Sequence, residues 1–201
     1  MSVAAELAQA AAQLVVDEGM DYAAAKRKAA RGFGTRVELP SHEELEDAVR
    51  EHIALFCADT QPAELQALRE VALLWMQRLA EYRPHVGGAV WRGTATRLSA
   101  VQLDLYCDDP KAAEIALINA GVDYDVASLD RPAHSRQRHG SEPLNVLIVS
   151  SPSAALGEPV TVHLVLHDAD DQRGALKPDA RGRSWRGDTA ALQRSMAGPS
   201  P

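Results

Sequence analysis

The sequence is poor in the residues that build several common kinds of site. Its 201 residues include only two cysteines, Cys57 and Cys107, too few for a disulfide framework and without the spacing of zinc ligands. Aromatic residues make up 4% of the chain, which argues against a stacking surface for single-stranded nucleic acid. There is no Gly-rich loop ending in Gly-Lys-Ser/Thr. We therefore expect no disulfide-linked partner and no P-loop chemistry.

Positive charge and long apolar runs are also scarce. The formal net charge is −7, which repels phosphate backbones at long range and disfavours free nucleic acid as the default partner. Residues 1–16 contain Glu6 but no Lys or Arg, so they lack the positive flank of a secretory signal. No apolar run approaches membrane-spanning length. These features predict a soluble cytoplasmic protein with no membrane partner.

The first half of the chain has the pattern of helices. Asp21 can cap a helix, Ser41 and Glu44 have capping-box spacing, and Pro62 suits a first helical turn. The expected helices cover residues 4–16, 21–31 and 42–58, with a fourth that opens at Thr60-Gln61-Pro62 and ends before Pro84.

From residue 85 onward the pattern changes to short strands. Alternating apolar residues predict strands over residues 85–91, 101–107, 122–128, 144–149 and 160–166, the last two antiparallel. Asp108-Asp109-Pro110 predicts the start of a helix that runs over residues 112–120, and Asp188 can cap a final helix to about Met196.

One segment in this half has the spacing of a motif. Two glycines, Gly87 and Gly88, end an apolar strand start; Arg92-Gly93 follows, and Ser99 stands just before the strand that begins at Val101. This layout resembles the nucleotidyltransferase superfamily, the minimal polymerase-beta-like transferases, whose signature is apolar-Gly-Ser, then Arg-Gly, then Ser-Asp-apolar-Asp-apolar. The resemblance covers about residues 86–168.

The resemblance implies a fold and a division of the chain. We expect an α+β fold, with a small mixed β-sheet of nucleotidyltransferase type packed with an N-terminal helical subdomain. The expected parts are a helical N-terminal subdomain (1–82), a nucleotidyltransferase-like domain (83–168) and an Arg/Gly/Pro-rich C-terminal tail (169–201). A backbone and hydroxyl cradle of the kind that holds nucleotide phosphates is expected at Gly87, Gly88, Arg92, Gly93, Thr94, Thr96 and Ser99.

The metal-binding half of the signature is missing. Its two acidic positions fall on Ala100 and Gln102, and the third, expected in the strand over residues 160–166, falls on Thr161 or His163. Hard divalent cations need several charged oxygen ligands, so these residues predict a degenerate metal site. Asp104 is the next acidic residue on that strand face, about 7 Å beyond Gln102.

Two functions follow from this pattern. The first is a nucleotidyltransferase-like protein, a pseudoenzyme, that binds a nucleotide, an RNA or a protein partner without transfer. The alternative is an active nucleotidyltransferase that uses Mg²⁺ in a rearranged site with Asp104 as a catalytic residue, modifying RNA, protein or a small molecule. Asp123 and Asp125 also have the spacing of a metal pair, although a solvated strand face is favoured for them.

Three basic segments could contact phosphate or RNA against the overall acidity. One is the predicted second helix, with Lys26, Arg27, Lys28 and Arg31; the others are the loop over residues 131–141 and the tail around Trp185. For the helix and the loop, a solvated surface is favoured over a binding site. In the tail, one tryptophan among arginines is a weak RNA-contact pattern.

Overall fold

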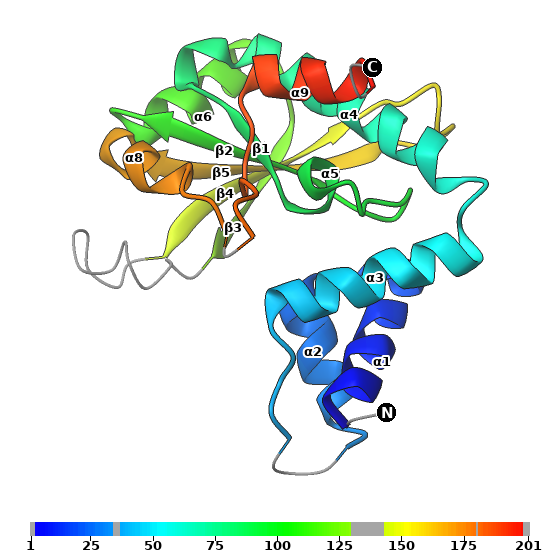
Figure 1. Ribbon diagram of the computed structural model, residues 1–201. Helices are drawn as coiled ribbons and strands as arrows, with labels where there is room; N and C mark the ends of the chain where they lie inside the picture. The colour runs from blue at the N-terminus through cyan, green and yellow to red at the C-terminus, as the bar shows by residue number, and fades with distance from the viewer. Residues whose placement is uncertain (1–2, 34–36, 130–142, 180, 199–201) are drawn as a thin grey trace. The chain divides into compact units, whose positions relative to one another are not determined.

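The chain forms two compact units, which the computed structural model describes over residues 3–33, 37–129, 143–179 and 181–198. A helical unit consists of Met1–Leu65 and Gly93–Ser99, and a sheet unit consists of Gln66–Arg92 and Ala100–Pro201. Figure 1 gives the order of the elements along the chain. The basic loop predicted over residues 131–141 lies outside the described residues.

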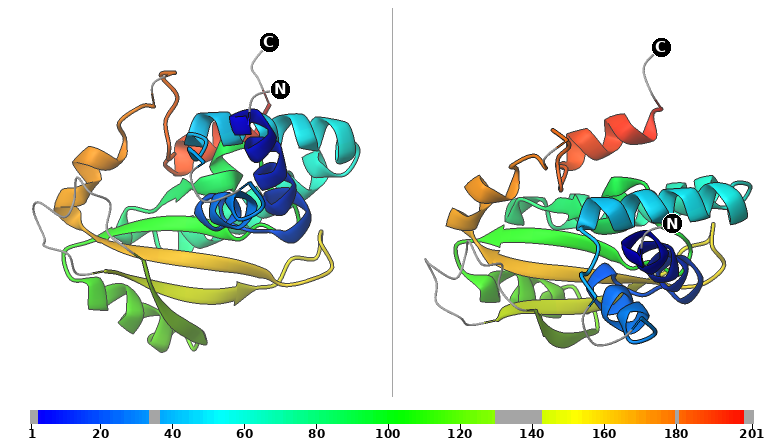
Figure 2. Two further views of the ribbon diagram at one scale, coloured as in Figure 1. Left: turned by 90° about the horizontal axis from the view of Figure 1, so that it is seen from below. Right: turned by 60° about the horizontal axis from the view of Figure 1, so that its bottom comes forward.

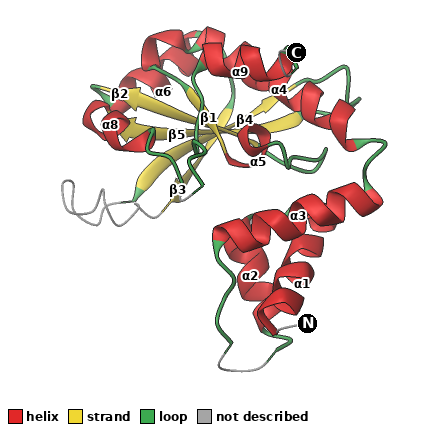
Figure 3. Ribbon diagram, in the orientation of Figure 1, coloured by secondary structure: helices red, strands yellow, loops and turns green. Residues whose placement is uncertain are grey.

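The helical unit is built on three helices, α1 (Val3–Glu18), α2 (Tyr22–Ala30) and α3 (His42–Phe56). Figure 3 shows no strand among the described residues before α4 (Gln61–Arg78), which contributes to both units. The buried residues recur every three or four positions, so each helix turns one apolar stripe inward. The core of this unit includes Leu7, Ala11, Val15, Leu45, Val49 and Ile53.

The helix starts follow the capping residues in the sequence. The Asp21 side chain accepts a hydrogen bond from the Ala24 N–H, and Ser41 and Glu44 form both bonds of a capping box. These contacts satisfy N–H groups that the first turn of a helix leaves without a partner. Both predicted caps are confirmed. Among the described helices, none has the length and apolar content needed to cross a membrane.

The sheet unit contains a five-stranded mixed sheet in the order β1-β2-β5-β4-β3. Its strands are β1 (His85–Gly87), β2 (Val101–Cys107), β3 (Tyr124–Leu129), β4 (Leu144–Ser151) and β5 (Val160–Asp168). β2 and β5 pair in parallel, and the other neighbours pair antiparallel. Figure 2 shows the green β2 beside the golden β5 at the centre of the sheet. The predicted α+β fold with a mixed sheet is confirmed.

The helices of this unit begin and end at polar caps. Asp109 caps α6 (Pro110–Asn119), which packs on β2 and β5, and Asp188 caps α9 (Thr189–Met196), which lies beside β1. Shorter helical segments are η1 (Ala80–Tyr82), α5 (Gly88–Arg92), η2 (Ala169–Asp171) and α8 (Gln172–Ala175). The final helix predicted after Asp188 is therefore confirmed.

One strand prediction is wrong at its end. Residues 85–91 were expected to form a single strand, but β1 stops at Gly87 and the chain enters α5 at Gly88. Gly88 has φ +59°, a left-handed backbone conformation that disfavours residues with a Cβ atom. The second glycine of the pair thus turns the chain from strand to helix.

Candidate functional site

The paired glycines lie directly over a cluster of polar side chains in the sheet unit. A Cβ atom on Gly87 would lie 3.3 Å from Asp104 Oδ2, 3.6 Å from Gln102 Nε2 and 3.6 Å from Arg186 Cγ. On Gly88, a Cβ atom would lie 3.5 Å from Gln102 Oε1. A side chain at Gly87 would therefore be packed tightly against Asp104, whereas at Gly88 the contact would be an ordinary one and the positive φ (+59°) is what favours glycine.

The cluster lies on one face of the sheet. Side chains alternate along a strand, so Gln102, Asp104 and Tyr106 share a face of β2, while Val101, Leu103 and Leu105 form the apolar face. The parallel register with β5 adds two histidines to the polar face. His163 pairs with Gln102, and His167 pairs with Tyr106.

Asp104 is the centre of this polar face. It is 0% exposed, and its two oxygens have different partners: His167 Nε2 is 2.6 Å from Oδ1, and Arg186 Nε donates to Oδ2 at 2.7 Å. Gln102 Nε2 also donates to Oδ2, at 3.3 Å. Burial alone would raise the pKa of Asp104, but the His167 hydrogen bond and the Arg186 charge hold it below its ordinary value.

Aromatic rings extend the cluster away from Gln102. The Tyr106 ring stacks on His167, with 5.1 Å between centroids, and meets the edge of the His85 ring at 5.4 Å. Burial raises the pKa of the Tyr106 hydroxyl, which has no hydrogen-bond partner among the described residues. The group beside the Asp104–His167 pair is thus a neutral phenol held in place by packing.

Arg92, a predicted nucleotide ligand, is held by the C-terminal part of the sheet unit. Its guanidinium lies 3.0 Å from Asp179 Oδ2, donates to the Ser184 carbonyl at 3.2 Å and lies 4.5 Å from the Trp185 ring centroid. The Arg92 and Asp179 side chains are 7% and 0% exposed. The arginine of the motif is therefore committed to internal contacts in this structure.

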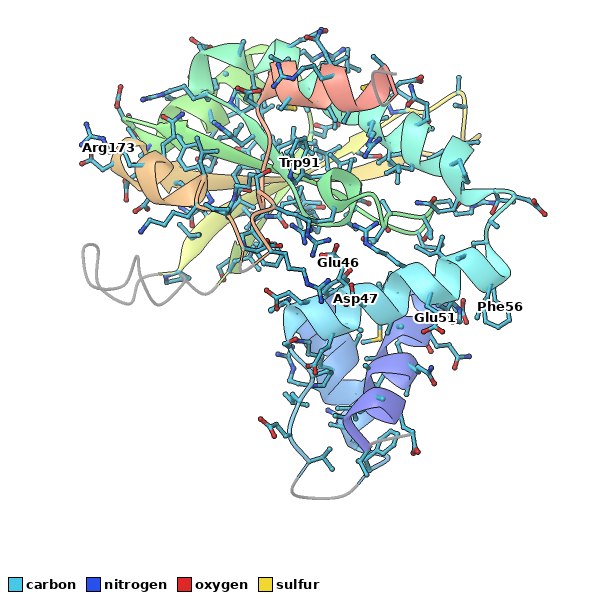
Figure 4. The ribbon with its side chains drawn as sticks, in the orientation of Figure 1. Glu46, Asp47, Glu51, Phe56, Trp91 and Arg173 are labelled. Carbon is cyan, nitrogen blue, oxygen red and sulfur yellow. The ribbon has the colours of Figure 1, made fainter. Side chains whose placement is uncertain are left out.

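The same C-terminal segment pairs with β1. Val86 and Gly187 exchange two backbone hydrogen bonds of 2.9 Å, and the Trp91 indole donates to the Ser184 carbonyl at 3.0 Å. Figure 4 labels Trp91 on α5. We call the described residues 178–179 and 181–188 the C-terminal strap. It brings Arg186 to Asp104 although the two residues are 82 positions apart in the sequence.

The remaining cradle residues belong to the helical unit. Gln61 Nε2 donates to the carbonyls of Gly93 (3.2 Å) and Ala95 (2.8 Å), which fixes this loop against the start of α4. Thr94 and Thr96 are 2% and 5% exposed. The Ser99 hydroxyl accepts a hydrogen bond from the Thr96 N–H at 3.0 Å.

The threonine hydroxyls that were expected to face phosphates are buried within the helical unit. Thr94 Oγ1 lies 3.5 Å from the Tyr22 hydroxyl, and Thr96 Oγ1 is buried without a partner among the described residues. Gly87, Gly88 and Arg92 belong to the sheet unit, so the seven predicted cradle residues are divided between the two units. Their role as a nucleotide cradle stays a prediction.

The four degenerate metal positions offer little to a divalent cation. Gln102 on β2 lies opposite His163 on β5, and burial lowers the pKa of His163. Thr161 lies opposite Ser150 on β4. Ala100 precedes β2 without a ligand atom. Within the described residues, no group of three His, Cys, Asp or Glu side chains could hold a metal ion.

The sheet order also separates the acidic residues proposed for a rearranged metal site. Asp104 is on β2 and Asp125 is on β3, three strand positions away. At the usual strand spacing this places their backbones about 14 Å apart, too far for one metal ion to bridge. Asp123 lies just before β3. The structure does not bring these carboxylates together.

The basic residues singled out in the sequence have varied surroundings. Lys26 is buried, which lowers its pKa, whereas Lys28 forms an ion pair with Glu18 at 2.5 Å. Arg27 and Arg31 are exposed. In the tail, Arg183 and Arg186 bind carboxylates of the sheet unit.

His167 and Arg186, the two partners of the Asp104 carboxylate, were not identified from the sequence. His167 follows His163 at strand spacing, so alternation along β5 could have placed both on one face. Arg186 gave no such signal, because its contact with Asp104 depends on where the C-terminal strap lies. Only the tertiary structure identifies it.

Comparisons with known proteins give limited similarity. No protein-family model and no curated protein matches this chain. A solved structure, that of Cid1 in complex with the UTP analogue UMPNPP, is similar with a TM-score of 0.35 and 14% sequence identity over 63% of this chain. The similar region covers 37% of that chain, well under two thirds of its length.

Proposed function

We propose that this chain is a nucleotidyltransferase-like protein that binds a nucleotide without transferring it by the two-metal route. The motif layout supports the proposal: Gly87-Gly88 at the end of β1, Arg92-Gly93 after it, and β2 carrying the side chains that face the glycines. The mixed sheet is of the kind that the resemblance implies. RNA and a protein partner are the other ligands that the resemblance leaves open.

The proposal that nucleotide binding does not require a metal ion rests on the contacts of the Asp104 carboxylate. Both of its oxygens accept hydrogen bonds from cationic or ring N–H groups, and the side chain is fully buried. A carboxylate already neutralised by Arg186 gains little from a metal ion, and a two-metal site needs several free carboxylates. Gln102 and His163, the nearest neighbours on that face, are uncharged ligands at most.

Binding can be tested by equilibrium dialysis with the four ribonucleoside triphosphates, in Mg²⁺ and in EDTA. We expect saturable binding of at least one of them, with equal affinity in both conditions. Gly88→Ala should weaken it, because the added methyl group would stand over Gln102. Gly157→Ala is the matched control, since Gly157 also has positive φ (+71°) but no atom within 4 Å of its Cβ position. Absence of binding by all four nucleotides would refute the proposal.

Transfer is tested separately with α-labelled nucleoside triphosphates and total RNA or protein as acceptor. We expect no label transfer by the unaltered chain, and transfer by an Ala100→Asp, Gln102→Asp variant would show that the scaffold lacks only its carboxylates. Transfer by the unaltered chain that is lost in Asp104→Ala would instead establish the active alternative. Label transfer by the unaltered chain and equally by Asp104→Ala would mean that residues other than Asp104 catalyse the transfer.

A further inference from the structure

The C-terminal strap lies against the glycines of the proposed nucleotide site. Gly187 exchanges two backbone hydrogen bonds with Val86 of β1. The Arg186 side chain passes beside Gly87, since a Cβ atom on that glycine would lie 3.6 Å from Arg186 Cγ, and its Nε reaches Asp104. An arginine of the strap therefore fills the space next to Gly87 and over the Asp104 carboxylate.

The strap also supplies an anion to Arg92. Asp179 is 0% exposed, and its Oδ2 lies 3.0 Å from Arg92 Nη2 and 3.4 Å from Arg183 Nε. Its Oδ1 accepts hydrogen bonds from the N–H groups of Arg181 (2.9 Å) and Arg183 (2.8 Å). Carboxylates and phosphates make the same kind of paired contact with a guanidinium group. If Arg92 is a nucleotide ligand, Asp179 holds it where a phosphate would.

Polar contacts hold the described part of the strap. These residues form neither helix nor strand (Figure 3), and no apolar side chain among them is fully buried. Trp185 is half-buried, with its ring 4.5 Å from the Arg92 guanidinium carbon. The buried anchor comes after the strap, at Leu192 of α9, which is 0% exposed. Segments with few buried apolar contacts open while the rest of the protein stays folded.

Opening of the strap would not leave a buried charge without a partner. Arg186 moves with the strap, and its departure exposes the Asp104 carboxylate to water. The large penalty for breaking a buried ion pair applies when one charge stays buried alone. A triphosphate that approaches the site can also compensate Arg92 in place of Asp179.

We propose that the strap is an autoinhibitory segment, in which Asp179 and Arg186 occupy the nucleotide site until a nucleoside triphosphate displaces them. This inference rests on the proposed function. Since nucleotide and closed strap compete for Arg92, the apparent affinity is the intrinsic affinity reduced by the fraction of molecules with an open strap.

Hydrogen exchange tests the displacement on the unaltered chain, with each of the four ribonucleoside triphosphates in EDTA. We expect a bound nucleotide to speed amide exchange in residues 181–188, including the Gly187 N–H that is bonded to Val86, and to leave β4 unchanged. Unchanged or slower exchange in the strap with a nucleotide bound would overturn the proposal. This measurement needs no variant, so it does not depend on the folding of one.

Asp179→Asn tests the role of the carboxylate. The amide oxygen still accepts from the Arg181 and Arg183 N–H groups, whereas its NH₂ group would oppose the Arg92 guanidinium. We expect about tenfold tighter binding of the triphosphate and faster strap exchange without it. Adding Arg92→Met should cancel the gain, because Asp179 acts through that arginine. A gain that survives Arg92→Met would overturn the proposal.

Asp108→Asn is the matched control. Asp108 pairs with Arg83 at the surface and is 89% exposed, so this variant has the same change of charge and should leave the affinity unchanged. An equal gain in both variants would show only an effect of net charge and overturn the proposal. Unchanged or weaker binding by Asp179→Asn, when the unaltered chain binds, would overturn it and leave the proposed function standing. Binding of no triphosphate by either protein would refute both.

Discussion

The buried ion pair between Asp104 and Arg186 should be a major contributor to the stability of the sheet unit. Asp104 is completely buried and the Arg186 side chain is 23% exposed, with 2.7 Å between the paired atoms. Removing one partner of a buried pair leaves the other charge uncompensated and typically costs about 3–5 kcal/mol. Because Arg186 keeps some contact with water, we expect about 3 kcal/mol for Asp104→Asn and a similar loss for Arg186→Met.

The double variant separates the pair interaction from other effects of each substitution. When Asp104→Asn and Arg186→Met are combined, no charge of the pair remains buried without a partner, so we expect a total loss of about 4 kcal/mol and a coupling energy of about 2 kcal/mol. Urea unfolding followed by tryptophan fluorescence measures these losses with a signal that comes from the sheet unit. All three tryptophans, Trp75, Trp91 and Trp185, belong to that unit.

A surface ion pair of the same unit provides the control. Arg83 and Asp108 lie 3.3 Å apart, but their side chains are 43% and 89% exposed, so their coupling should be far smaller. If the losses at Asp104 and Arg186 simply add in the double variant, or if Asp104→Asn costs less than about 1 kcal/mol, the buried pair does not stabilise the unit as we infer.

Three further predictions concern the same cluster. Gly187→Ala should detach the C-terminal strap, because a Cβ atom there would overlap the Trp91 ring. We expect a lower urea midpoint and a shifted fluorescence maximum. An unchanged midpoint and maximum would be evidence against the contact. Tyr106→Phe should leave the midpoint equal or higher, since it removes a buried hydroxyl without a partner among the described residues; a loss above about 1 kcal/mol would reveal a hidden bond. The His167 hydrogen bond and the Arg186 charge hold the pKa of Asp104 below its ordinary value, so its contribution to stability is present above the ordinary pKa of an aspartate and is lost as the pH falls through the lower pKa of the folded state. Asp104→Asn should therefore flatten the acid limb of a fluorescence titration, and an unchanged limb would contradict this.

Local features of the fold could be predicted from the sequence because their causes are local. Asp21, Ser41, Asp109 and Asp188 each cap the helix that follows them, through hydrogen bonds to N–H groups two or three residues away. Alternation likewise identified β2, β4 and β5 as strands. The end of β1 was misplaced, because residues 88–92 continue the apolar pattern while the backbone of Gly88 leaves the strand.

The candidate site was predictable only in part. Strand alternation indicated Asp104 as the acidic residue nearest the altered metal positions, and the structure pairs it with His167 and Arg186. The predicted ligand Arg92 is bound to Asp179, which lies 87 positions further along the chain. The contacts of Asp104 with Arg186 and of Arg92 with Asp179 cannot be predicted from the spacing of these residues in the sequence, because residues more than 80 positions apart can meet anywhere in the fold.

By itself, the sequence determined most of the longer helices and strands of this protein and the loss of carboxylates at Ala100 and Gln102, because these depend on residue identity and on neighbours a few positions apart. The tertiary structure decided which charges meet. A buried carboxylate must find its counter-charge wherever the folded chain brings one, and here the C-terminal strap brings Arg186 to Asp104.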